Sequence, residues 1–151
     1  MHKKTYKVLI VYSTNDTLWK ISSVIVKVFD QKKYKVTTLP AKDTSIPHLS
    51  AADIIIFGTD DTGKNFQNGE FKELYRACTG INFAGRMCGL FSSFSLKAIE
   101  ELKRMLKDTE IDIYKDPLLY TKSKDIHDGV VKSWIEGLLA SFKEFLNVRE
   151  F

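Results

Sequence analysis

The sequence predicts a doubly wound α/β fold, in which helices cover both faces of a parallel sheet. Five strand-like segments alternate with helical segments, which is typical of parallel strands joined by right-handed crossovers. The segments 7–12 and 52–58 are almost continuous apolar runs, as expected for strands buried on both faces. The chain has 151 residues, the size of one domain (1–151) with a substantial core.

The first half of the chain supplies three predicted strands. The β-branched run 7–12 is the first strand. A helix over 18–28 follows, because its apolar residues recur at spacings of three and four. The alternating segment 34–38 is the second strand, and 40–50, with two prolines, is a loop with at most a turn or two of helix. The third strand, 52–58, has the strongest buried-strand pattern of the chain.

The second half continues the alternation of loops, helices and strands. The expected elements are, in order, a polar loop at 59–69, a helix with its apolar face between Phe71 and Cys78, a fourth strand at 86–92, a helix at 98–106, a fifth strand at 110–120 and a closing helix at 130–145. We expect Asp116-Pro117 to interrupt the fifth strand, because proline cannot donate a ladder hydrogen bond.

The composition excludes several classes of protein. The chain is 44% hydrophobic and 28% charged, which is typical of a globular protein and unlike disordered, collagen-like or disulfide-rich chains. Its apolar runs are much shorter than the roughly 18 residues of a membrane-spanning helix. The first residues also lack the apolar stretch of a signal peptide. We therefore expect a cytoplasmic protein that does not contact a membrane.

The cysteines and histidines predict neither a metal site nor a catalytic centre. Cys78 and Cys88 form no CxxC motif, so we expect two small buried side chains. His2, His48 and His127 are isolated in the sequence and are expected at the surface. We identify no catalytic acid, base or nucleophile, so the sequence leaves it uncertain whether the chain is an enzyme, and an electron carrier or binding module is favoured over a stand-alone catalyst.

Positive charge is concentrated at the start of the chain. Residues 1–40 hold eight lysines and two acids, for a net charge of +6, although the whole chain has only +4. No aromatic residues are interleaved with these lysines and no nucleic-acid motif is present, so we expect a solvated surface and no nucleic-acid partner.

Three loops mark the place where a ligand would bind. In open α/β sheets, ligands bind beyond the carboxyl ends of the strands, where the strand order reverses. The loops that follow the first, third and fourth strands are 13–18, 59–69 and 92–96.

Over essentially its whole length the chain resembles the flavodoxin family. The matching pieces are 7–13 as first strand and loop entry, 52–59 as third strand, and 89–93 as fourth strand and loop. The resemblance implies a five-stranded sheet of order 2-1-3-4-5 and FMN bound at the edge formed by the three loops. It also implies electron transfer to a redox partner protein, or a role as the flavin domain of a larger reductase.

The first loop departs from the family motif S/T-x-T-G-x-T, which wraps the FMN phosphate. Aligned without gaps, Asp16 stands at the glycine position and Leu18 replaces a hydroxyl donor. A carboxylate about 4 Å from a phosphate charge costs about 1 to 4 kcal/mol, and a lost hydrogen bond to a charged oxygen about 1.5 to 3 kcal/mol. Asp16 is equally typical of a helix start. Hydrogen-bonding capacity remains at Ser13, Thr14, Asn15 and Thr17.

The other two loops keep parts of an FMN site. Thr62 stands where many family members have an aromatic residue that stacks on the flavin, and Phe66, Phe94 or Trp19 are possible substitutes. The second loop contributes the candidate residues Thr59, Asp60, Asp61, Thr62 and Gly63, and the third contributes Ser92, Ser93 and Phe94.

Rival families fit less well. A two-component receiver domain would use residues like Asp60, Ser92 and Lys115, but it needs an aspartate at the end of the third strand, where Gly58 stands. No GxxxxGK[ST] or GxGxxG motif follows the first strand, which excludes P-loop and dinucleotide-binding proteins.

Two functions remain open. One is an FMN-dependent electron carrier with a divergent phosphate loop, and the other is a cofactor-free module that acts by contact with an unknown protein partner. The loop chemistry favours weakened or lost FMN binding. The sequence pI near 9.0 differs from the generally acidic flavodoxins, so a different partner is expected.

Overall fold

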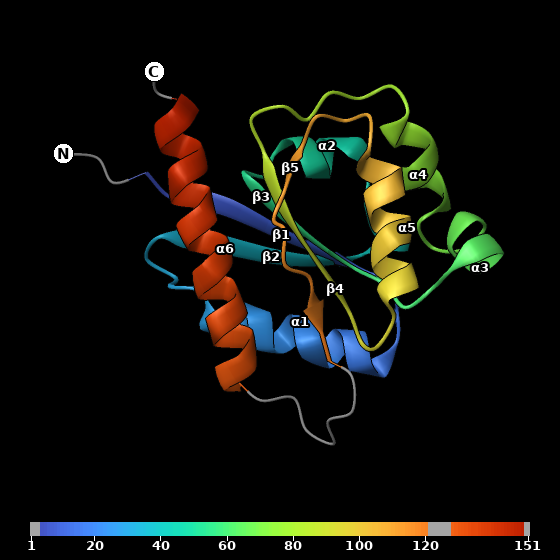
Figure 1. Cartoon of the computed structure of the whole chain (residues 1–151), viewed down its shortest axis with the longest axis horizontal. Coiled ribbons are helices and arrows are strands. Elements are labelled where there is room, and N and C mark those ends of the chain that lie inside the picture. Colours follow the sequence, from blue (N-terminus) through green and yellow to red (C-terminus); the bar gives the residue numbers. More distant parts are fainter. Residues whose placement is uncertain (1–3, 121–127, 150–151) are drawn as a thin grey trace.

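The computed structural model of the chain describes residues 4–120 and 128–149 (Figure 1). Its parallel sheet has the order β2-β1-β3-β4-β5, which confirms the predicted topology. The strands are β1 (Tyr6–Tyr12), β2 (Tyr34–Pro40), β3 (Ile54–Gly58), β4 (Met87–Ser92), β5 (Asp112–Ile113) and β6 (Leu118–Leu119).

The fifth position of the sheet is divided between two short strands. β5 pairs with the start of β4, where Met87 lies opposite Asp112, and β6 pairs with its end, where Phe91 lies opposite Leu118. Asp116 and Pro117 lie between the two strands, so the predicted interruption is confirmed.

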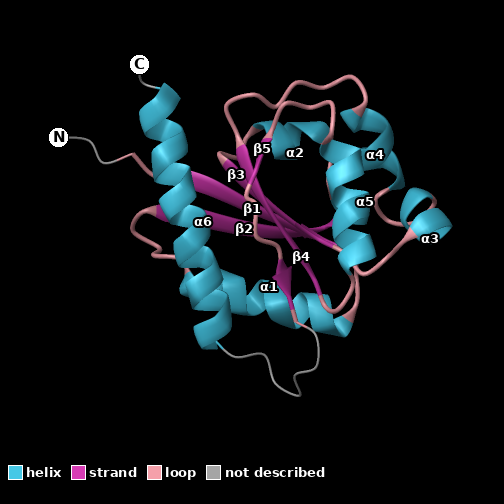
Figure 2. Cartoon of the chain, viewed as in Figure 1, coloured by secondary structure: helices cyan, strands magenta, loops and turns pink. Residues whose placement is uncertain are grey.

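Helices cover both faces of the sheet (Figure 2). α1 and α6 pack together on one face, and the shorter helices and α5 lie on the other. The helices are α1 (Asp16–Val28), α2 (Ile46–Ser50), α3 (Gly63–Gln67), α4 (Lys72–Cys78), α5 (Leu96–Leu106) and α6 (Asp128–Arg149), with a 3-10 turn at Ala41–Asp43. α3 falls inside the segment expected to be a loop, since a single turn with one apolar residue shows no helical periodicity.

Strand alternation builds a core on each side of the sheet. In β3, Ile54 and Ile56 join the cluster under α1 and α6, and Ile55 and Phe57 join the opposite cluster. All four side chains are fully buried, and burial of such a side chain contributes about 1.5 to 3 kcal/mol. The sheet is therefore buried on both faces, as the apolar runs predicted.

The two cysteines are buried thiols, as predicted. Burial raises the pKa of Cys78 to about 11 and raises that of Cys88 further. Both thiols are thus protonated at neutral pH and belong to the core. None of the helices in the described ranges has the length and apolar character needed to cross a membrane.

The three central strands end together. Tyr12 lies opposite Gly58 in the β1–β3 pair, and Gly58 lies opposite Phe91 in the β3–β4 pair. A Cβ atom on Gly58 would lie 2.1 Å from Cζ of Phe91, so only glycine fits there. The loops that follow β1, β3 and β4 consequently leave the sheet at one edge.

Candidate functional site

Backbone and hydroxyl hydrogen bonds hold the three loops together where they leave the sheet. The Ser13 amide donates to the Gly58 carbonyl at 3.0 Å, and the Thr59 amide donates to the Phe91 carbonyl at 3.2 Å. The buried hydroxyls of Ser13 and Thr59 lie 2.8 Å apart and share a hydrogen bond. We call this region, formed by residues 13–18, 59–63 with Glu70, and 92–96, the three-loop edge.

The first loop is built as a helix start. Asn15 caps α1, since its Oδ1 accepts a hydrogen bond from the Leu18 amide at 2.8 Å. Asp16 is the first helical residue and is exposed, so its carboxylate lies at the positive end of the helix dipole. Thr17 is exposed beside it, whereas the Leu18 side chain is fully buried. Leu18 therefore serves the core.

A carboxylate of the protein itself binds the phosphate-loop residue Thr14. Glu70, from the segment between α3 and α4, accepts hydrogen bonds from the Thr14 amide at 2.6 Å and from the Thr14 hydroxyl at 2.7 Å. A backbone amide and a hydroxyl near a helix N-terminus are the donors that hold a phosphate oxygen in anion sites. Both donors of Thr14 are thus bound to an internal anion.

A second carboxylate joins all three loops. Asp60 accepts hydrogen bonds from the Ser92 hydroxyl at 2.7 Å and from the Ser93 amide and hydroxyl at 2.7 and 2.6 Å. The Asn15 side-chain amide donates at 3.1 Å to Oδ2, the oxygen that also accepts from the Ser93 hydroxyl. Hydrogen bonds to an ionised acceptor are about twice as strong as neutral ones, so Asp60 stabilises the arrangement of the loops.

The three-loop edge is acidic. Burial and the negative charge of Glu70 raise the pKa of Asp61, and a hydrogen bond from Ser13 opposes this shift. The ion pairs found within residues 4–120 and 128–149 leave out Asp16, Asp60, Asp61 and Glu70. Among the described residues, no lysine or arginine forms an ion pair with these carboxylates.

The second loop is also held by a glutamate. Gly63 adopts a φ of 54°, which favours glycine, and its amide donates to Oε2 of Glu101 at 2.8 Å. Glu101 is buried on α5 and forms an ion pair with Arg104. Thr62 is half-buried at the start of α3. The amide of Gly63 is therefore bound to α5.

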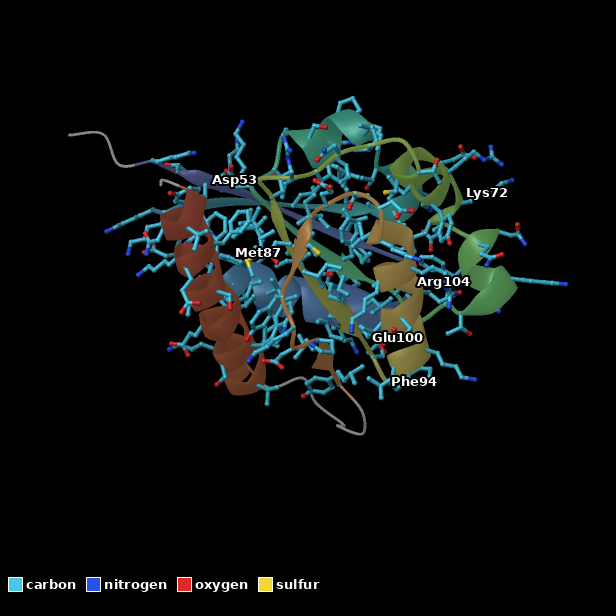
Figure 3. The ribbon with its side chains drawn as sticks, turned by 45° about the horizontal axis from the view of Figure 1, so that its top comes forward. Asp53, Lys72, Met87, Phe94, Glu100 and Arg104 are labelled. Atoms are coloured by element: carbon cyan, nitrogen blue, oxygen red, sulfur yellow. The ribbon has the colours of Figure 1, made fainter. Side chains whose placement is uncertain are left out.

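The three aromatic candidates differ in exposure. Phe66 is 1% exposed and stacks on Phe71 with ring centroids 5.3 Å apart, so it is a core residue and the suggestion that it stacks on a flavin is wrong. Trp19 in the first turns of α1 is 57% exposed, and Phe94 before α5 is 67% exposed. Figure 3 shows Phe94 beside the start of α5. These two rings, together with Leu96, are the exposed apolar groups near the three-loop edge.

Sequence reasoning did not find Glu70 and Glu101. Glu70 lies one residue beyond the segment expected to be a loop, and Glu101 lies on a helix that was interpreted by its apolar face alone. Glu101 is a charged residue, yet it is buried next to Leu102 on the same helix. The apolar periodicity of the helix does not predict this burial. No local signal marks Glu70, because its contact with Thr14 spans 56 positions.

Several residues of the three loops that the resemblance assigns to FMN are bound to carboxylates of the protein itself. Thr14 is bound to Glu70, Ser92 and Ser93 are bound to Asp60, and Gly63 is bound to Glu101. A phosphate dianion bound to the first loop would have to displace Glu70 from Thr14 and remain beside this carboxylate. No cationic side chain of the described residues forms an ion pair with Glu70 to offset the repulsion.

No family model matches the chain, and no curated protein matches its sequence. Solved structures do match its fold. Flavodoxin 2 from Bacillus cereus is 18% identical, with a TM-score of 0.77 over 89% of this chain and 99% of that one. A short-chain flavodoxin associated with a bacterial microcompartment is 13% identical, with a TM-score of 0.75 over 91% and 99% of the two chains.

A third match is a flavodoxin from Fusobacterium nucleatum bound to flavin mononucleotide. It is 14% identical, with a TM-score of 0.67 over 91% of this chain and 99% of that chain. At such identities the likeness concerns the fold: the chain has a flavodoxin-like fold, with the strand order and layers described above.

Proposed function

We propose that this flavodoxin-fold protein works without bound FMN and acts by contact with another protein at its three-loop edge. The observation that carries the proposal is the pair of hydrogen bonds from Thr14 to Glu70. An internal carboxylate thus occupies two donors of the first loop, the amide and the hydroxyl of Thr14, that a phosphate would use.

The energetic cost of FMN binding supports this proposal. Each hydrogen bond to a charged acceptor contributes about 1.5 to 3 kcal/mol, and entry of a phosphate would break those of Thr14. A displaced Glu70 would stay close to the phosphate, and each carboxylate at about 4 Å adds about 1 to 4 kcal/mol of repulsion per phosphate charge. Asp16 and Asp61 lie in or beside the same loops and add to this repulsion.

The exposed apolar groups favour protein contact. Of the five large hydrophobic side chains exposed among the described residues, Trp19, Phe94 and Leu96 lie at the starts of α1 and α5. Aromatic side chains are enriched in the centres of protein interfaces. With the carboxylates beside them, these groups suit a partner that offers an apolar pocket with a basic rim.

The second candidate function is electron transfer with bound FMN. It is favoured by the match to an FMN-bound flavodoxin fold. In this alternative the flavin supplies the redox chemistry, and Trp19 or Phe94 is the ring available for stacking.

A titration of FMN, with riboflavin as control, separates the two candidates. We expect neither flavin to change the thermal midpoint of the protein or to lose fluorescence on mixing. FMN binding without riboflavin binding would show that the loop holds a phosphate and would contradict the proposal.

Two matched variants test the role of Glu70. Glu70→Ala frees the donors of Thr14 and should increase the affinity for FMN about tenfold or more, as expected for removal of at least about 1.4 kcal/mol of competition. Glu73→Ala removes an exposed carboxylate from α4 that forms an ion pair with Arg76, and should have no such effect. If the two variants had the same affinity for FMN, Glu70 would not be competing with the phosphate for Thr14.

A separate pair of variants tests whether the three-loop edge contacts another protein. Trp19→Ser and Phe94→Ser together should abolish capture of proteins that the unmodified chain retains, and Val148→Ser should not. Val148 is 74% exposed near the end of α6, on another part of the molecule. Retention of the same proteins by both variants would contradict a contact surface at the three-loop edge.

A further inference from the structure

A cavity of about 280 Å³ lies between α2 and the strands β1 and β2, separate from the three-loop edge. Lys7 and Leu9 of β1, Lys35 and Thr37 of β2, and Pro47 and His48 of α2 line it. None of these residues belongs to the loops that follow β1, β3 and β4. The cavity is therefore a second candidate site.

The inner part of the cavity is apolar. Leu9 and Ala52 are each 5% exposed, and Leu39 packs against the same core cluster. α2 has only five residues, so it covers β1 and β2 incompletely. Leu9, Leu39 and Ala52 therefore form an apolar floor beneath an opening of a size that suits a small molecule.

Positive charge surrounds the opening. Lys7 and Lys35 lie directly opposite one another in the β1–β2 register, on the face that carries Leu9 and Thr37. Both lysines are exposed, and neither takes part in an ion pair within the ranges that the structure describes. The nearest acid in contact is Asp53, whose carboxylate accepts the backbone amide of Lys7 at 2.9 Å.

His48 adds a neutral donor at the same opening. Its Nδ1 accepts a hydrogen bond from the Ser45 amide at 3.0 Å. A neutral imidazole that accepts at Nδ1 carries its proton on Nε2. The cavity thus combines two ammonium groups, an imidazole N–H donor and an apolar interior.

We propose that this cavity binds a small amphipathic carboxylate, with the apolar body against Leu9, Leu39 and Ala52 and the carboxylate between Lys7 and Lys35. The cationic opening selects an anion, and the apolar floor selects a ligand with a hydrocarbon body over a bare inorganic ion. The unpaired ammonium groups supply the charge complementarity that identifies the occupant. The inference does not depend on the state of the three-loop edge.

Titration of octanoate into the full chain, followed by amide chemical shifts in ¹⁵N–¹H NMR spectra, tests the proposal. We expect saturable shifts at Leu9, Thr37 and His48, and no saturable shift with octanol or inorganic phosphate. Equal shifts with octanol would show an apolar crevice without anion selectivity and would overturn the proposal, as would the absence of shifts with octanoate.

Charge-matched variants give a second measurement. Lys7→Gln with Lys35→Gln should weaken octanoate binding about tenfold or more, as expected when two charges near the carboxylate are lost. Lys20→Gln with Lys27→Gln removes the same charge from α1, which packs on the other face of the sheet, and should leave the affinity within about twofold. The same loss of affinity in both double variants would overturn the assignment, because general attraction would then account for binding.

Discussion

The three-loop edge and the cavity beside α2 carry opposite charges: carboxylates line the first, and lysines line the second. At the three-loop edge, Glu70 accepts hydrogen bonds from the amide and hydroxyl of Thr14, and Asp60 accepts hydrogen bonds from Ser92 and Ser93. At the cavity, Lys7 and Lys35 face an apolar floor without an acidic side chain paired to either ammonium in the described part of the chain. One region provides its own anion, and the other is complementary to an anion from outside.

A fold alone does not fix where a ligand binds. The strand order brings the loops after β1, β3 and β4 together, as in other sheets of this topology. Whether that edge accepts an anion depends on side chains such as Glu70, which the topology does not dictate. Lys7 and Lys35, which form no ion pair in the described ranges, lie away from this edge at the cavity beside α2.

Removal of Asp60 should have the largest effect on the three-loop edge. Asp60→Ala leaves the hydroxyls of Ser92 and Ser93 and the Ser93 amide without their acceptor. We expect the free energy of unfolding to fall by about 3 kcal/mol, since hydrogen bonds to charged groups contribute about 1.5 to 3 kcal/mol each and do not add fully. Urea unfolding measures the change.

Asp43→Ala is the matched control, because Asp43 is exposed in the turn after β2. It should change the free energy of unfolding by less than about 0.5 kcal/mol. If Asp60→Ala changed the free energy of unfolding as little as Asp43→Ala does, Asp60 would not be holding the three loops together.

Substitution of the neighbouring Asp61 should stabilise the protein, whereas substitution of Asp60 destabilises it. Burial and Glu70 raise the pKa of Asp61 above the ordinary value of 3.8, so the folded protein keeps this proton to a higher pH than the unfolded chain. Its contribution to stability is therefore lost as the pH rises through the window above 3.8. Asp61→Asn should raise the thermal midpoint by about 1 or 2 °C at about pH 7, because solvent screens this partly exposed group.

At about pH 3 the aspartate and asparagine forms should have the same thermal midpoint, since both side chains are then neutral. Thermal melts of the two proteins across this pH range make the comparison. A constant difference at all pH values would mean that the ionisation of Asp61 is not its cause.

The smallest effect is expected at the cavity. Lys7→Gln with Lys35→Gln removes two exposed ammonium groups, so the free energy of unfolding should change by less than about 0.5 kcal/mol. Urea unfolding of the double variant checks this. A large loss of stability would mean that the two lysines stabilise the strands. A lower ligand affinity of the double variant would then reflect partial unfolding and not the loss of a binding site.

The fold followed from the sequence because its signals are local. Apolar runs identified β1 and β3, and the spacing of Leu18, Ile21 and Ile25 identified α1. Asp116-Pro117 correctly predicted the division between β5 and β6. α3 was missed because Phe66 is its only buried side chain, which leaves no periodicity to detect.

The candidate site followed only in part. Loop positions placed Ser13, Thr59 and Asp60 at one edge of the sheet. In the structure Ser13 shares a hydrogen bond with Thr59, and Asp60 accepts one from Asn15. The roles of Glu70 and Glu101 depend on contacts that span 56 and 38 positions, and no local pattern encodes such contacts. Sequence reasoning therefore located the edge and missed the two glutamates that hold it.

The central claim is tested most directly at the Thr14 amide, by ¹⁵N–¹H NMR spectra of the unmodified protein with and without FMN. If Glu70 holds the donors of Thr14, the amide signal of Thr14 should stay in place when FMN is added at neutral pH. A shift of the Thr14 signal with FMN, but not with riboflavin, would contradict the account, because the phosphate would then have replaced the carboxylate.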